Sequence, residues 1–369
     1  MVTSPTMHTP NTKRVMSQVY INVGGTDLGQ DVMADMLRVR IEGSVHLPDM
    51  AILELNDTDF KWSKNDTIKI GQELKIKFGE AGNKSDEDAF VGEVVAIETD
   101  LKMHGDISMF IRAYDRSHRL HRGRHTKTYL KMKDSEIAAQ VASSAGLQSD
   151  VETTQGVHDW VVQDNQTNWE FLQERAAVHG FEVQVRDKTL VFKPPPSVER
   201  EEVPLTWNQE MLSFKGTKTT GDQVNKVEVR GWDPINKKEV VGRAENPNHL
   251  PELEEGENHG GNVAKSAFQK EAVMVTAREP IFNQAQADRL AQTILDELAG
   301  GFITARGTAI GNPQLQLGSK VDIKNVGKHF TGKYVVTQIT HRFEPEGWNI
   351  DFEVSGRRSF DFLSLVSGR

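Results

Sequence analysis

Short stretches of alternating apolar and polar residues fill the first third of the chain. Alternation with a period of two is typical of strands that bury one face, and a glycine pair such as Gly24-Gly25 ends a strand in a turn. The stretches lie at residues 19–23, 37–41, 74–78, 92–97 and 107–113. Repeated short strands separated by turns predict a β-barrel or β-sandwich over residues 17–115.

The pattern changes to helical spacing in the middle of the chain. A helix is predicted over residues 135–145, and a second helix begins after Thr167. Thr167 and Glu170 have the spacing of a capping box, in which the hydroxyl and the carboxylate each satisfy a free backbone N–H. A hairpin over residues 181–192 completes a small α+β insert, predicted at residues 116–200, which leaves through a stiff run of three prolines.

Strands return in residues 201–369, around one long amphipathic helix predicted over residues 284–299. An acidic loop that contains glycine and proline is expected at residues 243–262. Residues 1–16 are polar and predict a flexible tail. The order of elements predicts a β-rich α+β fold in which two β domains flank the insert.

Composition narrows the possible function classes. A chain of 369 residues is expected to form two to four domains. The absence of cysteine excludes disulfides and thiolate zinc sites. A net charge of −9 argues against a general nucleic-acid binder, and no stretch approaches the ~18 apolar residues of a membrane span. The first residues also lack the apolar core of a secretory signal, so we expect neither nucleic acid nor a membrane as partner.

One basic segment stands out in this acidic chain. Residues 112–133 hold eight Lys and Arg against a single acid, Asp115. The segment predicts an electrostatic contact with an acidic neighbour, for which the loop at residues 246–262 of another copy is a candidate; a solvated loop is the alternative. The interface candidates are Arg116, Arg119, Arg122 and Arg124.

Candidate chemistry is sparse. His118, His121 and His125 could suggest a transition metal, but the arginines interleaved with them disfavour a bound cation. His158 and Asp159 could form half of a hydrolase site, yet adjacent residues on a strand point to opposite faces. The sequence has no phosphate-binding loop, nucleophile elbow or zinc-protease motif. We therefore expect no catalytic residue, no metal, no cofactor and no enzymatic activity.

Several motifs, in a fixed order around the helix pair, carry a family resemblance. They lie at residues 114–122, 169–172, 176–180, 311–318, 332–336 and 341–343. Together they resemble the phage late control protein D and the amino-terminal part of VgrG spike proteins, both related to the tail hub of T-even phages. The resemblance covers roughly residues 19–355.

The resemblance implies two tube-like β-barrel domains that flank the insert, and a homotrimer that presents a pseudo-sixfold ring. Such a ring joins a hexameric tail tube to a threefold spike in a phage tail, a type VI-like secretion system or an extracellular injection particle. The implied partners are a tail tube protein, a spike protein or C-terminal spike domain, and other baseplate proteins. The implied location is a virion tail or secreted particle assembled in the cytoplasm. VgrG proteins continue into a β-helical spike whereas this sequence stops at Arg369, so a free-standing hub and the hub portion of a longer chain are both open.

Two other function classes stay open at the level of sequence. A tail-associated cell-wall or polysaccharide hydrolase could assemble a pair of acids from the 53 Asp and Glu residues. A carbohydrate-binding β protein is the other alternative. The sequence favours the structural baseplate role, because that role needs glycines at barrel corners and covered sheet edges rather than a catalytic motif.

Overall fold

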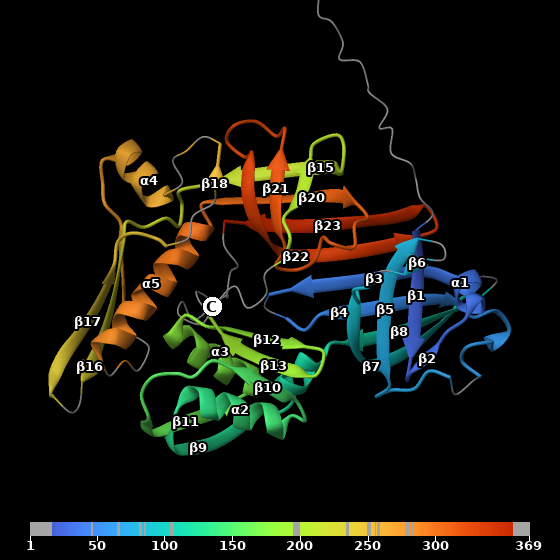
Figure 1. Cartoon of the computed structure of the whole chain (residues 1–369), viewed down its shortest axis with the longest axis horizontal. Helices are drawn as coiled ribbons and strands as arrows, with labels where there is room; N and C mark the ends of the chain where they lie inside the picture. The colour runs from blue at the N-terminus through green and yellow to red at the C-terminus, as the bar shows by residue number, and fades with distance from the viewer. Residues whose placement is uncertain are drawn as a thin grey trace, which may run out of the picture.

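The computed structural model describes residues 17–45, 47–64, 67–80, 83–84, 86–103, 107–194, 200–233, 236–248, 252–254, 256, 259–277, 281 and 283–356. The tail predicted at residues 1–16 lies outside the described residues. Figure 1 shows a large curved sheet with a small α+β lobe below it and a helix-and-strand lobe at one side.

The first β region is built from short strands, as the alternation predicts. Two short helices interrupt it, one before the second long strand and one after the third. Its elements are β1 (Ser17–Val23), β2 (Thr26–Asp27), α1 (Gln30–Asp35), β3 (Met36–Ser44), β4 (Met50–Asn56), η1 (Thr58–Phe60), β5 (Glu73–Glu80), β6 (Asn83–Lys84), β7 (Phe90–Leu101) and β8 (Ile107–Tyr114).

The insert contains the two predicted helices and the predicted hairpin. The capping box is present: the Thr167 hydroxyl accepts from the backbone N–H of Glu170 at 3.1 Å, and the Glu170 carboxylate accepts from the N–H of Thr167 at 2.9 Å. Gly180 ends the second helix with a left-handed φ of 67°. The elements are η2 (Arg116–His121), β9 (His125–Met132), α2 (Asp134–Ser144), β10 (Gln148–Val151), β11 (His158–Gln166), α3 (Asn168–His179), β12 (Glu182–Arg186) and β13 (Thr189–Lys193).

The last region holds the predicted long helix, α5, among strands. The segment predicted as an acidic loop at residues 243–262 also carries β18 and the first turn of a further helix, α4, which opens at Gly260-Gly261. The elements are β14 (Val203–Thr206), β15 (Met211–Lys218), β16 (Lys226–Asp233), β17 (Lys238–Ala244), β18 (Glu252–Leu253), α4 (Gly260–Phe268), β19 (Val273–Thr276), α5 (Gln284–Gly300), β20 (Ile303–Ile310), β21 (Lys320–Lys324), β22 (Gly332–Glu344) and β23 (Gly347–Ser355).

The two β regions share one 15-stranded sheet, whose main path runs β15-β20-β23-β22-β3-β4-β8-β7-β5-β1-β2. The regions join where β22 pairs antiparallel with β3, from Gln338 opposite Ser44 to Phe343 opposite Val39. The protein is mostly β, with 49% strand and 20% helix, and the sheet curls into a half-barrel. The predicted β-rich α+β fold class is confirmed.

Three apolar cores lie beneath these elements. The largest is shared by both β regions, a second fills the insert, and a third lies between α5 and the small sheet β17-β16-β19. Ala177 of α3 belongs to the third core, so the insert packs against α5 as well. Among the described residues, no helix has both the length and the apolar character needed to cross a membrane.

Candidate assembly surfaces

One face of the large sheet extends over eight successive strands and is mainly polar over the first five of them. The strands β15, β20, β23, β22, β3, β4, β8 and β7 form a ribbon in which each runs antiparallel to its neighbours. One face of the ribbon packs into the shared core. Along one row of the other face, Ser213, Thr308, Asp351, Thr340 and Glu42 lie directly opposite one another from strand to strand.

Charges of both signs alternate on this polar face. Arg342 contacts Asp351 at 2.9 Å, and Arg112 contacts Glu98 at 2.9 Å on the neighbouring strand. The face is hollowed over β15, β20, β22 and β23, where Lys215 and other polar side chains line a depression of about 310 Å³. A broad concave surface with mixed, mutually paired charges is suited to contact with water or with a passing polar chain rather than to burial.

In the part of the chain that the structure describes, β15 is free at one long edge of the ribbon, and the second half of β7 is free at the other. Strand β15 pairs with β20, and among the described residues its other side carries only an isolated bridge between Met211 and Trp207. Strand β7 pairs with β5 through residues 90–93, and beyond Val94 it pairs only with β8. Unpaired N–H and C=O groups therefore line residues 95–101 of β7 and the outer edge of β15.

Exposed apolar side chains cluster near both of these edges. Trp207 and Leu212, at the start of β15, are 43% and 49% exposed. Leu101 and Met103, at the end of β7, are 60% and 90% exposed. Large apolar groups at an unpaired strand edge promote aggregation of a monomer, whereas in an assembly they are buried against a neighbouring chain.

The structure places the first interface candidate, Arg116, at an internal junction. Its guanidinium is only 5% exposed and contacts Glu73 at 2.5 Å, Glu93 at 3.4 Å and the Asp187 carboxylate. Glu73 and Glu93 belong to the first β region, whereas Asp187 lies in the β12–β13 turn of the insert. Arg116 therefore ties the insert to the first β region.

The other candidates surround the same junction. Arg119 pairs with Glu93 and also donates to the carbonyl oxygen of Ala145 at 3.2 Å. Burial alone raises the pKa of Glu93, but the hydrogen bonds from Arg119 and His118 outweigh burial and hold the pKa below its usual value. Arg124 is exposed and pairs with Glu170 at 3.0 Å.

Arg122 differs from the other three arginines. It is exposed, and among the described residues its guanidinium has no hydrogen-bond or ion-pair partner. Of the four interface candidates it is thus the one with a charge left for a neighbour. No comparison tests the contact with an acidic loop of another copy, so it stays a prediction.

The three histidines do not converge on one point. His118 contacts the Glu93 carboxylate at 3.0 Å, and His121 stacks on Trp169 with ring centroids 5.0 Å apart. Burial lowers the pKa of His121. His125 is exposed at the start of β9.

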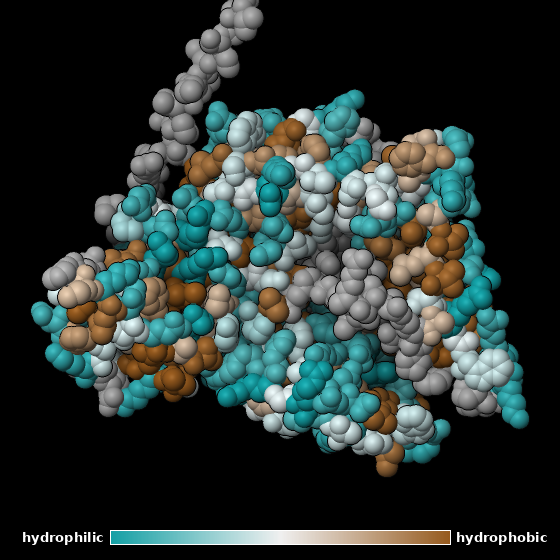
Figure 2. Space-filling view, turned by 180° about the vertical axis from the view of Figure 1, so that it is seen from behind, coloured by the Kyte–Doolittle hydropathy of each residue, from teal (hydrophilic) through white to brown (hydrophobic). Residues whose placement is uncertain are grey.

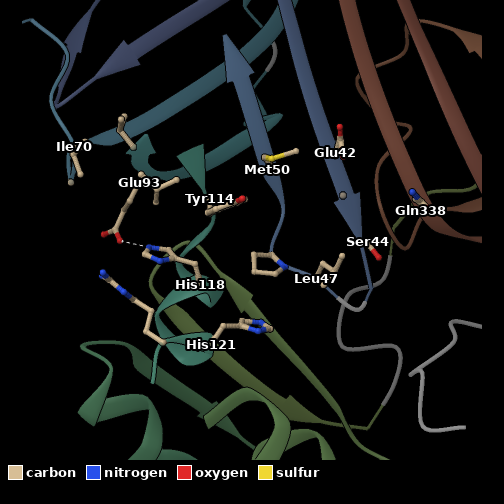
Figure 3. Close-up of a pocket in the computed structure, with 16 residues that line it drawn as sticks. Glu42, Ser44, Leu47, Met50, Ile70, Glu93, Tyr114, His118, His121 and Gln338 are labelled. Carbon is tan, nitrogen blue, oxygen red and sulfur yellow. Dashed lines mark hydrogen bonds and ion pairs between the residues drawn. The ribbon is translucent and has the colours of Figure 1, made fainter. Parts of the chain in front are cut away.

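A hollow lies where the outer face of the ribbon meets the insert (Figure 3). It is an open groove of about 790 Å³ with an apolar lining from the first β region and a wall of His118, His121 and Arg122 from the insert. Leu47 and Ile70 stand on its rim, 65% and 68% exposed. The apolar part of the lining is Leu47, Pro48, Met50, Ile70, Val94, Val95 and Tyr114. From behind, Figure 2 shows apolar residues gathered on the side of the first β region that faces the mostly hydrophilic insert.

The insert also holds a buried charge cluster that the sequence analysis missed. The Asp134 carboxylate is fully buried and accepts hydrogen bonds from His158 at 2.9 Å, His179 at 2.7 Å and Arg175 at 2.7 Å. Burial raises the pKa of Asp134, but these three partners outweigh burial and hold the pKa far below its usual value. Asp134 lies on α2, His158 on β11, and Arg175 and His179 on α3, so the cluster joins these three elements.

The pair His158 and Asp159 diverges, as the geometry of a strand requires. His158 points inward to Asp134, while the exposed Asp159 pairs with Lys131. No signal local to residues 158–159 could have revealed Asp134 as the partner, since it lies 24 residues earlier in the chain.

The fold is similar to that of solved tail proteins. The 43 kDa tail protein of prophage MuSo2 from Shewanella oneidensis has a TM-score of 0.69 and 14% identity, over 93% of this chain and 98% of that one. A tail protein from Neisseria meningitidis has a TM-score of 0.68 and 12% identity, over 92% and 96%. A type VI secretion component of E. coli, described as similar to bacteriophage T4 tail proteins, has a TM-score of 0.56 and 10% identity, over 94% and 76%. The TM-scores, from 0.56 to 0.69, show that the chain shares the fold of these phage tail and type VI secretion proteins.

Two further comparisons use the sequence alone. No curated protein matches the chain. A family model described as the Alg8 N-terminal domain matches residues 13–345, which is most of the sequence. The chain therefore belongs to the Alg8 N-terminal domain family.

Proposed function

We propose that this chain is a structural hub protein of a contractile injection apparatus, of the late control protein D and VgrG type, and that it acts as a homotrimeric ring. In this proposal the polar ribbon face lines the lumen, and the ring joins a hexameric tail tube to a threefold spike. The observation that carries the proposal is the eight-stranded ribbon, whose hollowed face is mainly polar over five strands and whose two edges present β15 and the second half of β7 unpaired. Solved tail proteins of the same fold support it.

The two edges fit each other in direction. Strands β15 and β7 are the first and the eighth of an antiparallel ribbon, so they run in opposite senses. A rotation about the ring axis does not change the direction of a strand relative to that axis. Strand β15 of one copy therefore lies antiparallel to β7 of the next copy. Antiparallel edges can form a ladder that satisfies the free N–H and C=O groups of both strands.

The same orientation pairs the exposed apolar ends. In an antiparallel ladder the start of β15 lies beside the end of β7. Leu212 and Trp207 of one copy then lie near Leu101 and Met103 of its neighbour, and these exposed side chains become buried. A symmetric ring closes only if each copy offers two complementary edges of this kind.

The proposed partners are a tail tube protein above the ring, a spike protein or C-terminal spike domain below it, and other baseplate proteins around the insert. We place the ring in a virion tail or a secreted injection particle after assembly in the cytoplasm. The role is structural and needs no catalytic group, so we expect no hydrolysis of purified peptidoglycan by the protein.

The absence of cysteine makes the seam directly testable. The double variant Leu101→Cys and Leu212→Cys should form disulfides between copies under mild oxidation and give a covalent trimer on a denaturing gel. The matched control is Trp160→Cys with Leu212→Cys, because Trp160 is as exposed as Leu101 but lies on β11 of the insert. Light scattering of the native protein should give three times the 41.3 kDa chain mass. A monomer at all concentrations, or equal cross-linking of the control, would contradict the ring.

A further inference from the structure

The groove at the insert begins where the free edge of β7 begins. Val95 lines the groove and follows Val94, the last residue of β7 that bonds to β5 or to the segment just before β5. The groove is therefore continuous with the seam described above. If a strand of another copy pairs with this edge, the residues that follow that strand at the Val95 end run directly into the groove.

We propose that the groove receives the turn at residues 219–222 of the neighbouring copy, and that Arg122 binds Asp222 of that copy. This inference rests on the proposed ring. In an antiparallel seam the end of β15, at Lys218, lies beside the start of the free edge of β7. The turn Thr219-Thr220-Gly221-Asp222 follows Lys218 immediately, so it is the segment that arrives at the groove.

The charges on the two sides complement each other. Arg122 is an exposed cation on the insert wall, and Asp222 is an exposed anion after β15. Within the part of the chain that the structure describes, neither side chain has an ion-pair or hydrogen-bond partner. The other charged groups of the groove are already paired: Glu93 contacts Arg116, Arg119 and His118, and Glu42 contacts Arg40. Arg122 is thus left to select an acidic group from outside the chain.

The turn itself is compact. Gly221 has no side chain, and its N–H donates to the Thr219 hydroxyl at 3.1 Å. The methyl groups of Thr219 and Thr220 can then contact the exposed rim at Leu47 and Ile70. In this arrangement the insert of one copy contacts the second β region of the next, and the insert acts as a latch on the seam.

The experiment is a charge swap read by trimer assembly. Arg122→Asp should raise the concentration at which half of the chains are trimeric about tenfold, because two acids then face each other across the seam. Asp222→Arg should have a similar effect, and the double swap Arg122→Asp with Asp222→Arg should restore assembly to near the native value. The matched control is Lys320→Asp, which makes the same change of charge on β21. Like Arg122, Lys320 is exposed and has no ion-pair partner among the described residues.

The same variants, combined with the cysteine pair at Leu101 and Leu212, separate the two proposals. If the cysteine pair cross-links and the swaps weaken and then restore assembly, both the ring and the latch are supported. If the cysteine pair cross-links but Arg122→Asp behaves like Lys320→Asp, or the double swap fails to restore assembly, the latch is overturned and the ring stands. If the cysteine pair does not cross-link at all, the ring fails and the latch with it.

Discussion

Two internal seams hold this molecule together, and they are built in opposite ways. The seam between the β regions is a six-residue backbone ladder of β22 with β3, and apolar rings cover it: Phe78 stacks on Trp348 at 4.3 Å and lies 5.6 Å from His341. The seam between the insert and the first β region centres instead on Arg116 and its three carboxylates.

The difference indicates that the two seams have different roles. Apolar burial with a continuous ladder joins the two β regions into one sheet, as the wall of the proposed ring requires. The ion pairs of a charged junction depend on geometry and on solvent. When the solvent changes, such a junction therefore opens at a lower free-energy cost than the apolar seam. We infer that the sheet would form the wall of the proposed ring, while the insert would be the part that adjusts to its neighbours.

The largest expected effect is at the apolar seam. Phe78→Ala removes a fully buried ring that packs on His341, Phe343 and Trp348. We expect a loss of about 4 kcal/mol in the free energy of unfolding, spread over the whole sheet. Chemical denaturation followed by tryptophan fluorescence measures it. A loss confined to the insert would contradict the assignment of Phe78 to the seam.

The charged seam should respond more locally. Arg116→Ala leaves Glu73 and Glu93 without their buried cation, and we expect about 3 kcal/mol less stability at the junction. Hydrogen exchange should speed up in β12 and β13 and stay unchanged in the β3–β22 ladder. Arg124→Ala is the control, since that exposed arginine contacts only the insert.

Acid should weaken the apolar seam through His341. Burial lowers the pKa of His341 to about 4, and its Nδ1 has no hydrogen-bond partner among the described residues. The unfolded chain takes up this proton near pH 6.5 and the folded chain only near pH 4, so stability falls as the pH drops through that window. Between pH 7 and pH 5 the loss is about 2 kcal/mol. His341→Leu should remove that part of the pH dependence, and an unchanged slope would refute the assignment.

Salt should give the smallest effect and act on the other seam. Raising NaCl from 0.1 to 1 M screens exposed pairs such as Lys188 with Glu73, at 3.7 Å, but not the buried ladder. We expect the junction to lose under about 1 kcal/mol, seen as faster exchange in β12 and β13. An equal increase of hydrogen exchange in β3 and β22 at high salt would contradict the difference between the two seams.

Local signals predicted the local structure. The capping box at Thr167 and Glu170 and the glycine at position 180 define a helix within a dozen residues, so the second helix was predicted close to its observed bounds. The helix α4 was missed because Gly260 and Gly261 open it within an acidic, glycine-containing stretch typical of a loop. The shared sheet was missed because the partners β3 and β22 are about 300 residues apart.

The candidate surfaces divide in the same way. The basic segment was visible as a run of charge, but its sequence does not reveal that Arg116 is buried and Arg122 is free. That distinction comes from Glu73, Glu93 and Asp187, which lie far away in the chain. The Asp134 cluster was invisible for the same reason.

The pairing of β22 with β3 also constrains how the chain can fold during synthesis. The ladder joins residues 39–44 to residues 338–343, so one half of the central seam waits until about 300 further residues have been synthesised. Contacts this distant in sequence carry a large loop-closure entropy and slow the final step. Until then β3 presents an open edge beside β4, and a nascent chain in that state is exposed to pairing with other nascent chains.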